Sequence, residues 1–412
     1  MKILSSQSIF KQKKRPLLRK YFGPSTLVTA AFIGPGTLTV CTLSGATNGY
    51  SLLWVLVLAT VTTIALQEMA ARLGLVTQKG LGEAIRSNID HPLLRAASVA
   101  LVFTAIIIGN AAYEAGNISG AALGLEGVFG TSIIWPMLIG LVSAGVLFVG
   151  KSKVLEGFLI CLVILMSLVF ILTAILVKPN LGDLLGGLVP SINSSNQLAV
   201  MALIGTTIVP YNLFLHAASV KTKWTDPSQM NNLRIENTIS IGLGGIISLA
   251  IVITSASTIY GTAVGGMSEM ALQLEPLLGS WARYFLGAGL FAAGISSSIT
   301  APLAAAYTAK GIFGWDNGVT DYRFRIVWMV VLISGIGFSV SGFQSISIIQ
   351  VAQIANGLLL PVIVFFLMVL SNKKKLLGDY VNKTWQNMLG VLVLFLSLLI
   401  SLRILNSVFD FL

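Results

Sequence analysis

The chain is dominated by long apolar segments separated by short polar stretches. A bilayer core of roughly 30 Å needs about 20 mostly apolar residues per helix. By this measure the sequence predicts an all-α membrane protein with about eleven transmembrane helices. They are expected near residues 24–47, 50–71, 94–123, 132–150, 153–177, 197–220, 235–261, 284–309, 325–342, 346–370 and 385–408.

Charged residues are too few to cover a surface that faces water. They make up 10% of the chain, against about 25% in an average soluble domain. This composition excludes a soluble enzyme, a disordered regulator and a nucleic-acid-binding protein. The lipid bilayer is therefore the first partner that the sequence predicts.

The distribution of the positive charges predicts how the chain is oriented. The net charge is +11, and 23 of the 26 Lys and Arg residues fall in the tail or in alternate loops. Because cytoplasmic loops are enriched in Lys and Arg, we expect a multi-pass cell-membrane protein with a cytoplasmic N-terminus. With an odd number of spans, the C-terminus then lies outside. Residues 1–20 are basic and contain no signal-peptide pattern, so they are expected to be a retained cytoplasmic tail.

Two of the predicted helices are interrupted near the middle of the membrane. The first contains Gly34, Pro35, Gly36 and Thr37, and the sixth contains 209–212, with Pro210 as its second residue. Proline removes an amide donor and clashes with the preceding turn, so both helices should break. Broken backbone at membrane depth is tolerated where it is buried in protein or lines a cavity.

The two breaks are five helices apart, which predicts an inverted repeat. Corresponding interruptions in two halves of a transporter indicate a substrate site at the repeat interface. We expect a transporter core over 21–372, with repeat one at about 21–180 and repeat two at about 190–372. A cytoplasmic loop and an accessory eleventh helix occupy 373–412.

Three further segments carry a family resemblance. These are LQEMAARLGLVTQKGLGEAIR at 66–86, GLFAAGISSSIT at 289–300 and LSNKKKLLGD at 370–379. Together with the two breaks, they make the chain resemble the Nramp family of divalent-metal transporters from about residue 20 to 385. The resemblance implies a LeuT-like fold with a 5+5 inverted repeat and broken helices 1 and 6.

The resemblance stops at the side chains that would hold the metal. The family's site uses an Asp-Pro-Gly-Asn break and a Met-Pro-His break. Here Gly34 and Thr37 replace the Asp and the Asn, while Val209 and Tyr211 replace the Met and the His. What remains is a neutral site of backbone carbonyls and hydroxyls, so the metal ligands are unknown. Asn212, two residues after Pro210, is a further candidate for contact with the substrate.

The third predicted helix contains polar residues on one face. Asn110, Glu114 and Asn117 are spaced i, i+4 and i+7. An acidic residue in a membrane helix is by default a functional-site hypothesis, and the family uses acids in this helix for proton passage. Glu114 is therefore a candidate for proton coupling. The alternative is a protonated Glu114 that is hydrogen-bonded to Asn110 and only holds helices together.

Three more positions match the family. Gln350 matches a glutamine that helps to line the family's site, and Gln353 and Asn356 continue its polar stripe. His216 matches the family's second histidine in the sixth helix and is a second proton-coupling candidate, with simple packing equally open. Glu236 is expected to be a solvated carboxylate at a helix start, beside Arg234.

The function that the sequence predicts is secondary transport by alternating access. The resemblance implies a divalent metal cation as substrate, and the neutral site favours Mg²⁺ or another hydrated ion. Two alternatives stay open: a small uncharged or zwitterionic organic solute, or a sensor or scaffold that does not transport. No enzymatic activity and no cofactor are expected, and the sequence does not predict an oligomeric state.

Overall fold

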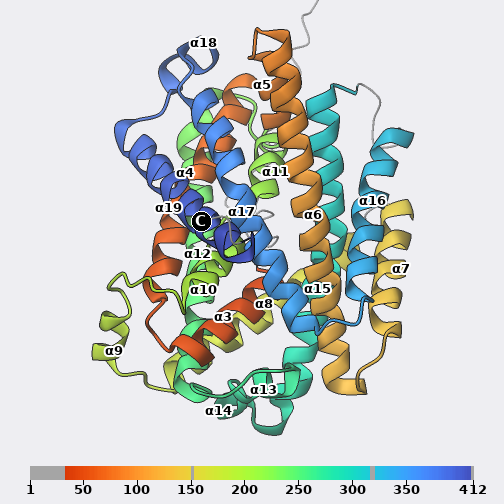
Figure 1. Ribbon diagram of the computed structural model, residues 1–412, viewed down its shortest axis with the longest axis vertical. Coiled ribbons are helices and arrows are strands. Elements are labelled where there is room, and N and C mark those ends of the chain that lie inside the picture. Colours follow the sequence, from red (N-terminus) through yellow and green to blue (C-terminus); the bar gives the residue numbers. More distant parts are fainter. Residues whose placement is uncertain (1–32, 150–152, 316–320, 410–412) are drawn as a thin grey trace, which may run out of the picture.

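A computed structural model of the protein describes residues 33–149, 153–315 and 321–409 (Figure 1). All regular elements in these residues are helices. The long ones are α3 (Pro35–Asn48), α4 (Leu53–Thr77), α6 (Pro92–Phe129), α7 (Ile134–Val149), α8 (Lys153–Leu176), α10 (Gln197–Thr207), α11 (Pro210–Val220), α12 (Met230–Thr258), α15 (Ala282–Phe313), α16 (Tyr322–Ser339), α17 (Ser345–Ser371) and α19 (Thr384–Phe409).

These twelve helices match the eleven predicted spans when α10 and α11 are taken together as one span. Within the described residues, nine helices are long and apolar enough to cross a membrane, counting α10 and α11 together. The shorter α7 and α3 supply the remaining two. The predicted tail at 1–20 and the first part of the first predicted span lie outside the described residues. The boundaries of the two repeats remain predictions.

Several connections contain short helices that hydropathy alone did not predict. They are α5 (Leu81–Ser87), α9 (Leu181–Gly186), α13 (Met267–Leu272), α14 (Glu275–Leu278) and α18 (Lys374–Leu377), with 3-10 turns at Pro227–Gln229, Gly279–Trp281 and Gly378–Tyr380. Each is too short to cross the bilayer. Two long helices also extend beyond their predicted ends. Helix α4 continues past residue 71 to Thr77, and α6 continues past residue 123 to Phe129.

The helices form two groups that pack side by side (Figure 1). In the first group, α12 packs against α3 and α4, and α4 also contacts α10 and α11. In the second, α6 packs against α7, α15 and α16. Helix α17 contacts both groups, and α19 packs against α17 and α4. The breaks therefore lie where the two groups meet.

Both predicted breaks are present. Gly34 has extended backbone torsions and precedes α3, which begins at Pro35. In the sixth span α10 ends at Thr207 and α11 begins at Pro210, leaving Ile208 and Val209 outside the helical conformation. Each proline occupies the first position of its helix, where the missing amide costs no hydrogen bond.

Candidate functional site

The two helix breaks lie against each other through a pair of threonines. Thr37 is in the first turn of α3, and Thr206 is in the last turn of α10. Their Oγ1 atoms are 2.9 Å apart, and both side chains are buried. The residues are 169 positions apart in the chain, so this hydrogen bond joins two distant segments close to the points where both backbones are interrupted.

Helix α17 closes one side of this region. Gly36, in the first break, leaves room for the amide of Gln353, because a Cβ at that position would lie 2.2 Å from Gln353 Nε2. Gly205 of α10 similarly lies against the Gln353 carbonyl. Gln353 is therefore held between both broken helices. Gln350 is only half-buried, whereas Gln353 and Asn356 are fully buried.

Helix α6, which packs against α17, closes a second side. A Cβ at Gly120 would lie 2.1 Å from the Pro35 ring, so α6 packs directly on the first break. The rings of Tyr113 and Tyr211 pack edge to face with centroids 5.3 Å apart, which connects α6 to the second break. Tyr211 stands where the family has histidine, and it brings an aromatic ring and a hydroxyl to the site.

Glu114 is fully buried on α6 and faces α16. Its Oε2 accepts a hydrogen bond of 3.2 Å from Asn117 Nδ2, and a Cβ at Gly335 would lie 2.5 Å from its Cγ. Asn110 instead donates to the carbonyl of Ile106 at 2.8 Å. The predicted partner, Asn110, is therefore wrong, because Asn117 takes that place. The alternative of a structural Glu114 stays open.

Several buried polar atoms of this region have no hydrogen-bond partner among the described residues. They come from α6, α11 and α17, and are Asn110 Oδ1, Glu114 Oε1, Asn212 Oδ1, Gln353 Oε1 and Asn356 Nδ2. Leaving such an atom unpaired costs about 1–3 kcal/mol. Unpaired buried groups of this kind suit a region that takes up water or a polar substrate.

The remaining predicted site residues are also buried at the second break. Val209 is 1% exposed and caps α11 without a side-chain hydrogen bond, as expected for an apolar residue. Asn212 lies two residues after Pro210 in the first turn of α11, and its backbone N–H donates to the Val209 carbonyl at 3.1 Å. The structure thus places Val209, Tyr211 and Asn212 in one turn.

His216 lies farther along α11 and contacts α4. Its Nδ1 is 3.0 Å from Gln67 Oε1, and both side chains are buried. The next residue on α4, Glu68, belongs to a separate polar network. His216 is thus positioned between the second break and the end of the bundle that carries α5 and α18.

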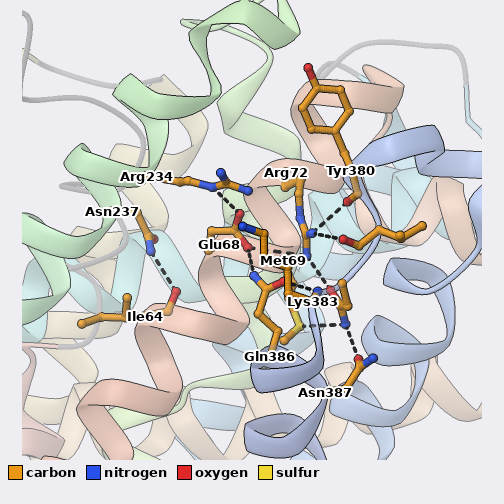
Figure 2. Close-up of polar contacts among 12 residues, drawn as sticks. Ile64, Glu68, Met69, Arg72, Arg234, Asn237, Tyr380, Lys383, Gln386 and Asn387 are labelled. Carbon is orange, nitrogen blue, oxygen red and sulfur yellow. Dashed lines mark hydrogen bonds and ion pairs between the residues drawn. The ribbon is translucent and has the colours of Figure 1, made fainter.

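Glu68 is the centre of a buried network that connects α4, α12 and α19 (Figure 2). It accepts from Arg234 Nε at 2.9 Å and from Gln386 Nε2 at 2.6 Å, and Arg72 lies 3.5 Å away. Arg72 is 1% exposed and donates to the carbonyls of Tyr380 and Val381 at 2.8 and 3.0 Å. The segment before α19 is therefore fastened to α4.

The expectation for Glu236 is wrong. Its side chain is 1% exposed and lies 2.6 Å from Lys223 Nζ, whereas Arg234 pairs with Glu68. The cause is that α12 begins at Met230 rather than near residue 235, so Glu236 lies two turns inside the helix and faces its neighbours.

The side-chain groups of the site that could coordinate a metal ion are hydroxyl, amide and carboxyl groups. Among the described residues, no group of three or more His, Cys, Asp and Glu side chains could hold a metal ion. Threonine hydroxyls, amides and one carboxyl group are hard, mostly neutral donors, which suit Mg²⁺ or water better than a soft transition metal. The chemistry of these groups therefore suits a hydrated cation or a polar solute.

Sequence reasoning did not single out Tyr113, Thr206 or the Glu68 network. Thr206 is four residues before Pro210, and Tyr113 immediately precedes Glu114, so proximity to a break or to a buried acid was the available signal. The network had no such signal, because Glu68 and Gln386 are 318 residues apart.

Comparisons with known proteins agree with this architecture. A sequence profile described as natural resistance-associated macrophage protein-like (Nramp) matches residues 25–407. A divalent metal cation transporter from Yersinia pestis (strain Pestoides F) is 27% identical over 397 residues, covering 92% of this chain and 94% of the relative. A transporter of the same name from a Nostoc species is 28% identical, covering 90% and 87%.

Solved structures match the fold. A mutant form of the Eremococcus coleocola manganese transporter superposes with a TM-score of 0.76 and 21% identity, covering 99% of this chain and 89% of the other. A nucleobase-cation-symport-1 family transporter, in a closed conformation, gives a TM-score of 0.56 and 14% identity over 94% of this chain and 93% of the other. The fold is thus the LeuT-like fold that the family resemblance implied.

Proposed function

This chain belongs to the natural resistance-associated macrophage protein family, and on that basis we propose that it carries a divalent metal cation across the membrane by alternating access. The observation that carries the proposal is the meeting of two broken helices, joined by the Thr37 and Thr206 hydroxyls 2.9 Å apart. Breaks at membrane depth are the usual substrate site of such folds. Two curated relatives are named as divalent metal cation transporters.

We propose that the cargo is Mg²⁺ or another cation that keeps part of its water. The site offers hydroxyls and amides, with no carboxylate, thioether or imidazole at the four positions where the family places its ligands. Mg²⁺ dehydrates reluctantly and is usually held with several waters in place. Thr37, Tyr211, Gln353 and Asn212 would then contact the ion's water shell, with Gln350 at the margin.

The motion that follows from this arrangement is rocking of one helix group against the other. Helices α3, α4, α10, α11 and α12 form the group that contains both breaks, and α6, α7, α15 and α16 form the other. Glu114, at the contact between α6 and α16, would carry the coupled proton, and His216 would relay it. The bias of Lys and Arg orients the N-terminus toward the cytoplasm and the C-terminus outward.

A second candidate cargo is a small uncharged or zwitterionic solute. The specific observation in its favour is the set of unpaired buried atoms, which includes both an acceptor at Asn110 Oδ1 and a donor at Asn356 Nδ2. A polar organic molecule would satisfy both kinds of group. A bare cation would satisfy only the acceptors.

Binding calorimetry on the purified protein separates these alternatives from transition-metal transport. We expect no binding of Mn²⁺ or Cd²⁺ at micromolar concentration, because a micromolar Kd needs about −8 kcal/mol and neutral oxygens offset little of the dehydration cost. Gly34→Asp, Thr37→Asn, Val209→Met and Tyr211→His together restore the family's ligands at both breaks. This quadruple variant should gain measurable Mn²⁺ binding.

The matched control carries only Val209→Met and Tyr211→His, which restore the softer ligands without the carboxylate. It should bind Mn²⁺ at least about tenfold more weakly than the quadruple variant. Micromolar Mn²⁺ binding by the unmodified protein would contradict the hydrated-cation proposal, and the plain transition-metal reading would replace it.

A further inference from the structure

A pocket of about 300 Å³ lies between the short helix α5 and the end of α15. Its volume is about ten times the ~30 Å³ that one water molecule occupies in the liquid. It is lined by Lys79, Glu83, Arg86, Ser87, Lys310, Gly314 and Trp315, and we refer to it as the basic pocket. In Figure 1, α5 lies near the top of the molecule, at the same end as α18.

The local sequence explains why the charged groups of α5 converge there. Leu81, Ala84 and Ile85 are buried, so the helix presents Glu83, Arg86 and Ser87 on its other face. Glu83 also accepts from the Gly80 amide at 3.3 Å, which fixes the start of the helix. The pocket wall formed by α5 is thus set by an amphipathic turn rather than by a random loop.

The end of α15 forms the second wall. Gly314 terminates the helix with a φ of +67°, in the left-handed region that glycine adopts without strain. A Cβ there would lie 1.5 Å from Arg86 Nη1, so the glycine also makes room for the guanidinium. Lys310 is in the last turn of α15, where the helix dipole stabilises a cation.

The pocket carries an excess of positive charge. Three cations line it, and its single carboxylate, Glu83, lies 3.8 Å from Lys221 outside the pocket. Within the part of the chain that the structure describes, none of Lys79, Arg86 and Lys310 forms an ion pair. Gathering three cations in one pocket is unfavourable without an anion between them.

Aromatic side chains lie beside the basic pocket at the end of α15. Trp315 stacks on Phe313 with centroids 5.4 Å apart, and Phe313 meets Phe103 of α6 edge to face at 4.9 Å. Phe313 is 41% exposed. Tryptophan is enriched at the level of lipid headgroups, and basic pockets between membrane helices bind anionic headgroups.

We propose that the basic pocket binds the phosphate of an anionic phospholipid from the leaflet on that side of the bilayer. Lys79, Arg86 and Lys310 donate to the phosphate oxygens, with the Ser87 hydroxyl beside them. Trp315 and Phe313 contact the glycerol and the first acyl carbons. Arginine and lysine form short, charge-assisted hydrogen bonds with phosphate, and the exposed aromatic ring favours a lipid over a free anion.

Native mass spectrometry of the full chain, with added phosphatidylglycerol or phosphatidylcholine, tests this proposal. We expect retention of phosphatidylglycerol but not of phosphatidylcholine. Lys79→Gln with Lys310→Gln should weaken retention at least about tenfold while leaving Arg86 packed on Gly314. The control removes two charges from α18, by Lys374→Gln with Lys375→Gln, and should bind phosphatidylglycerol as the wild type does.

Three outcomes would overturn the proposal. One is unchanged retention of phosphatidylglycerol by the variant lacking Lys79 and Lys310. Another is an equal loss in the α18 control, which would indicate attraction to total charge rather than to the pocket. A third concerns the melting temperature of the protein. If inorganic phosphate alone raises it as much as phosphatidylglycerol does, a soluble anion is the ligand. A melting temperature within a few degrees of wild type shows that each variant is folded.

Discussion

At the scale of single residues, the most informative group is the buried carboxyl group of Glu114 on α6. Glu114 is 0% exposed, lies beside Gly335 of α16, and has one oxygen bonded to Asn117 and one without a partner among the described residues. An acidic group is costly inside a membrane protein, and such residues mark ion or proton pathways. Its retention therefore supports transport over a structural function.

Glu114→Gln should abolish the dependence of uptake on a pH gradient and leave the protein folded. Glutamine keeps the shape and can still accept the Asn117 hydrogen bond, but it cannot exchange a proton. The measurement is substrate uptake into liposomes with and without an imposed pH gradient, together with the melting temperature. Gradient-dependent uptake by this variant would show that Glu114 is structural.

Glu126→Gln is the matched control for this change. Glu126 is on the same helix, three turns farther along, but is only half-buried and accepts from Ser345 Oγ at 3.3 Å. Its substitution removes an acid of the same type from α6 without touching the region between α6 and α16. We expect uptake and its pH dependence to match those of the wild type.

The sequence was informative at the residue scale wherever a local pattern carried the chemistry. Pro35 and Pro210 could be identified because proline interrupts a helix in any context. The contacts of Gln353 with Gly36 and of Glu68 with Gln386 could not, because they join segments that are far apart in the chain. Glu236 was misplaced since a helix start five residues earlier turns the side chain from solvent to the interior.

At the scale of elements, the two broken helices are the parts most directly connected to transport. At each break the helix begins at a proline, and the residue before it, Gly34 or Val209, has an extended backbone conformation. The hydrogen bond between Thr37 and Thr206 connects the two breaks. Without proline, a new amide could pair with a carbonyl one turn earlier and extend the helix. The breaks therefore depend on local chemistry as well as on packing.

Pro35→Ala and Pro210→Ala should each lower uptake at least about tenfold while most of the protein still folds. The readouts are initial rates of liposome uptake and yield of monodisperse protein. Pro361→Ala is the control, because Pro361 lies inside α17, which continues from Ser345 to Ser371. Wild-type rates in both break variants would mean that the prolines are simple kinks.

The number and order of the membrane helices were predictable because apolar length is a local property. The short helices α5 and α13 and the precise ends of α4 and α6 were not, because they depend on contacts with neighbouring elements. The polar network around Arg72 could not be predicted either, because it also depends on contacts between elements that are far apart in the chain. It fastens the segment before α19 to α4 through backbone carbonyls, which no side-chain pattern reveals.

At the scale of the whole molecule, the chain belongs to the natural resistance-associated macrophage protein family and shares its fold with a solved manganese transporter. The chain covers 94% of the length of the Yersinia pestis transporter, and superposes on a manganese transporter with a TM-score of 0.76. The family resemblance nevertheless implies that Gly34, Thr37, Val209 and Tyr211 stand at the family's four ligand positions. We therefore propose that this scaffold for alternating access carries Mg²⁺ or another hydrated cation.

Uptake of Mg²⁺ into liposomes containing only this protein tests that claim most directly. We expect saturable Mg²⁺ uptake that is absent from protein-free liposomes and reduced by Pro210→Ala. Micromolar Mn²⁺ should neither enter nor compete, because the four positions offer no carboxylate to offset dehydration and no thioether that would favour Mn²⁺ over Mg²⁺. Saturable Mn²⁺ uptake at micromolar concentration, or the absence of Mg²⁺ uptake by folded protein, would contradict the proposal of a hydrated-cation transporter.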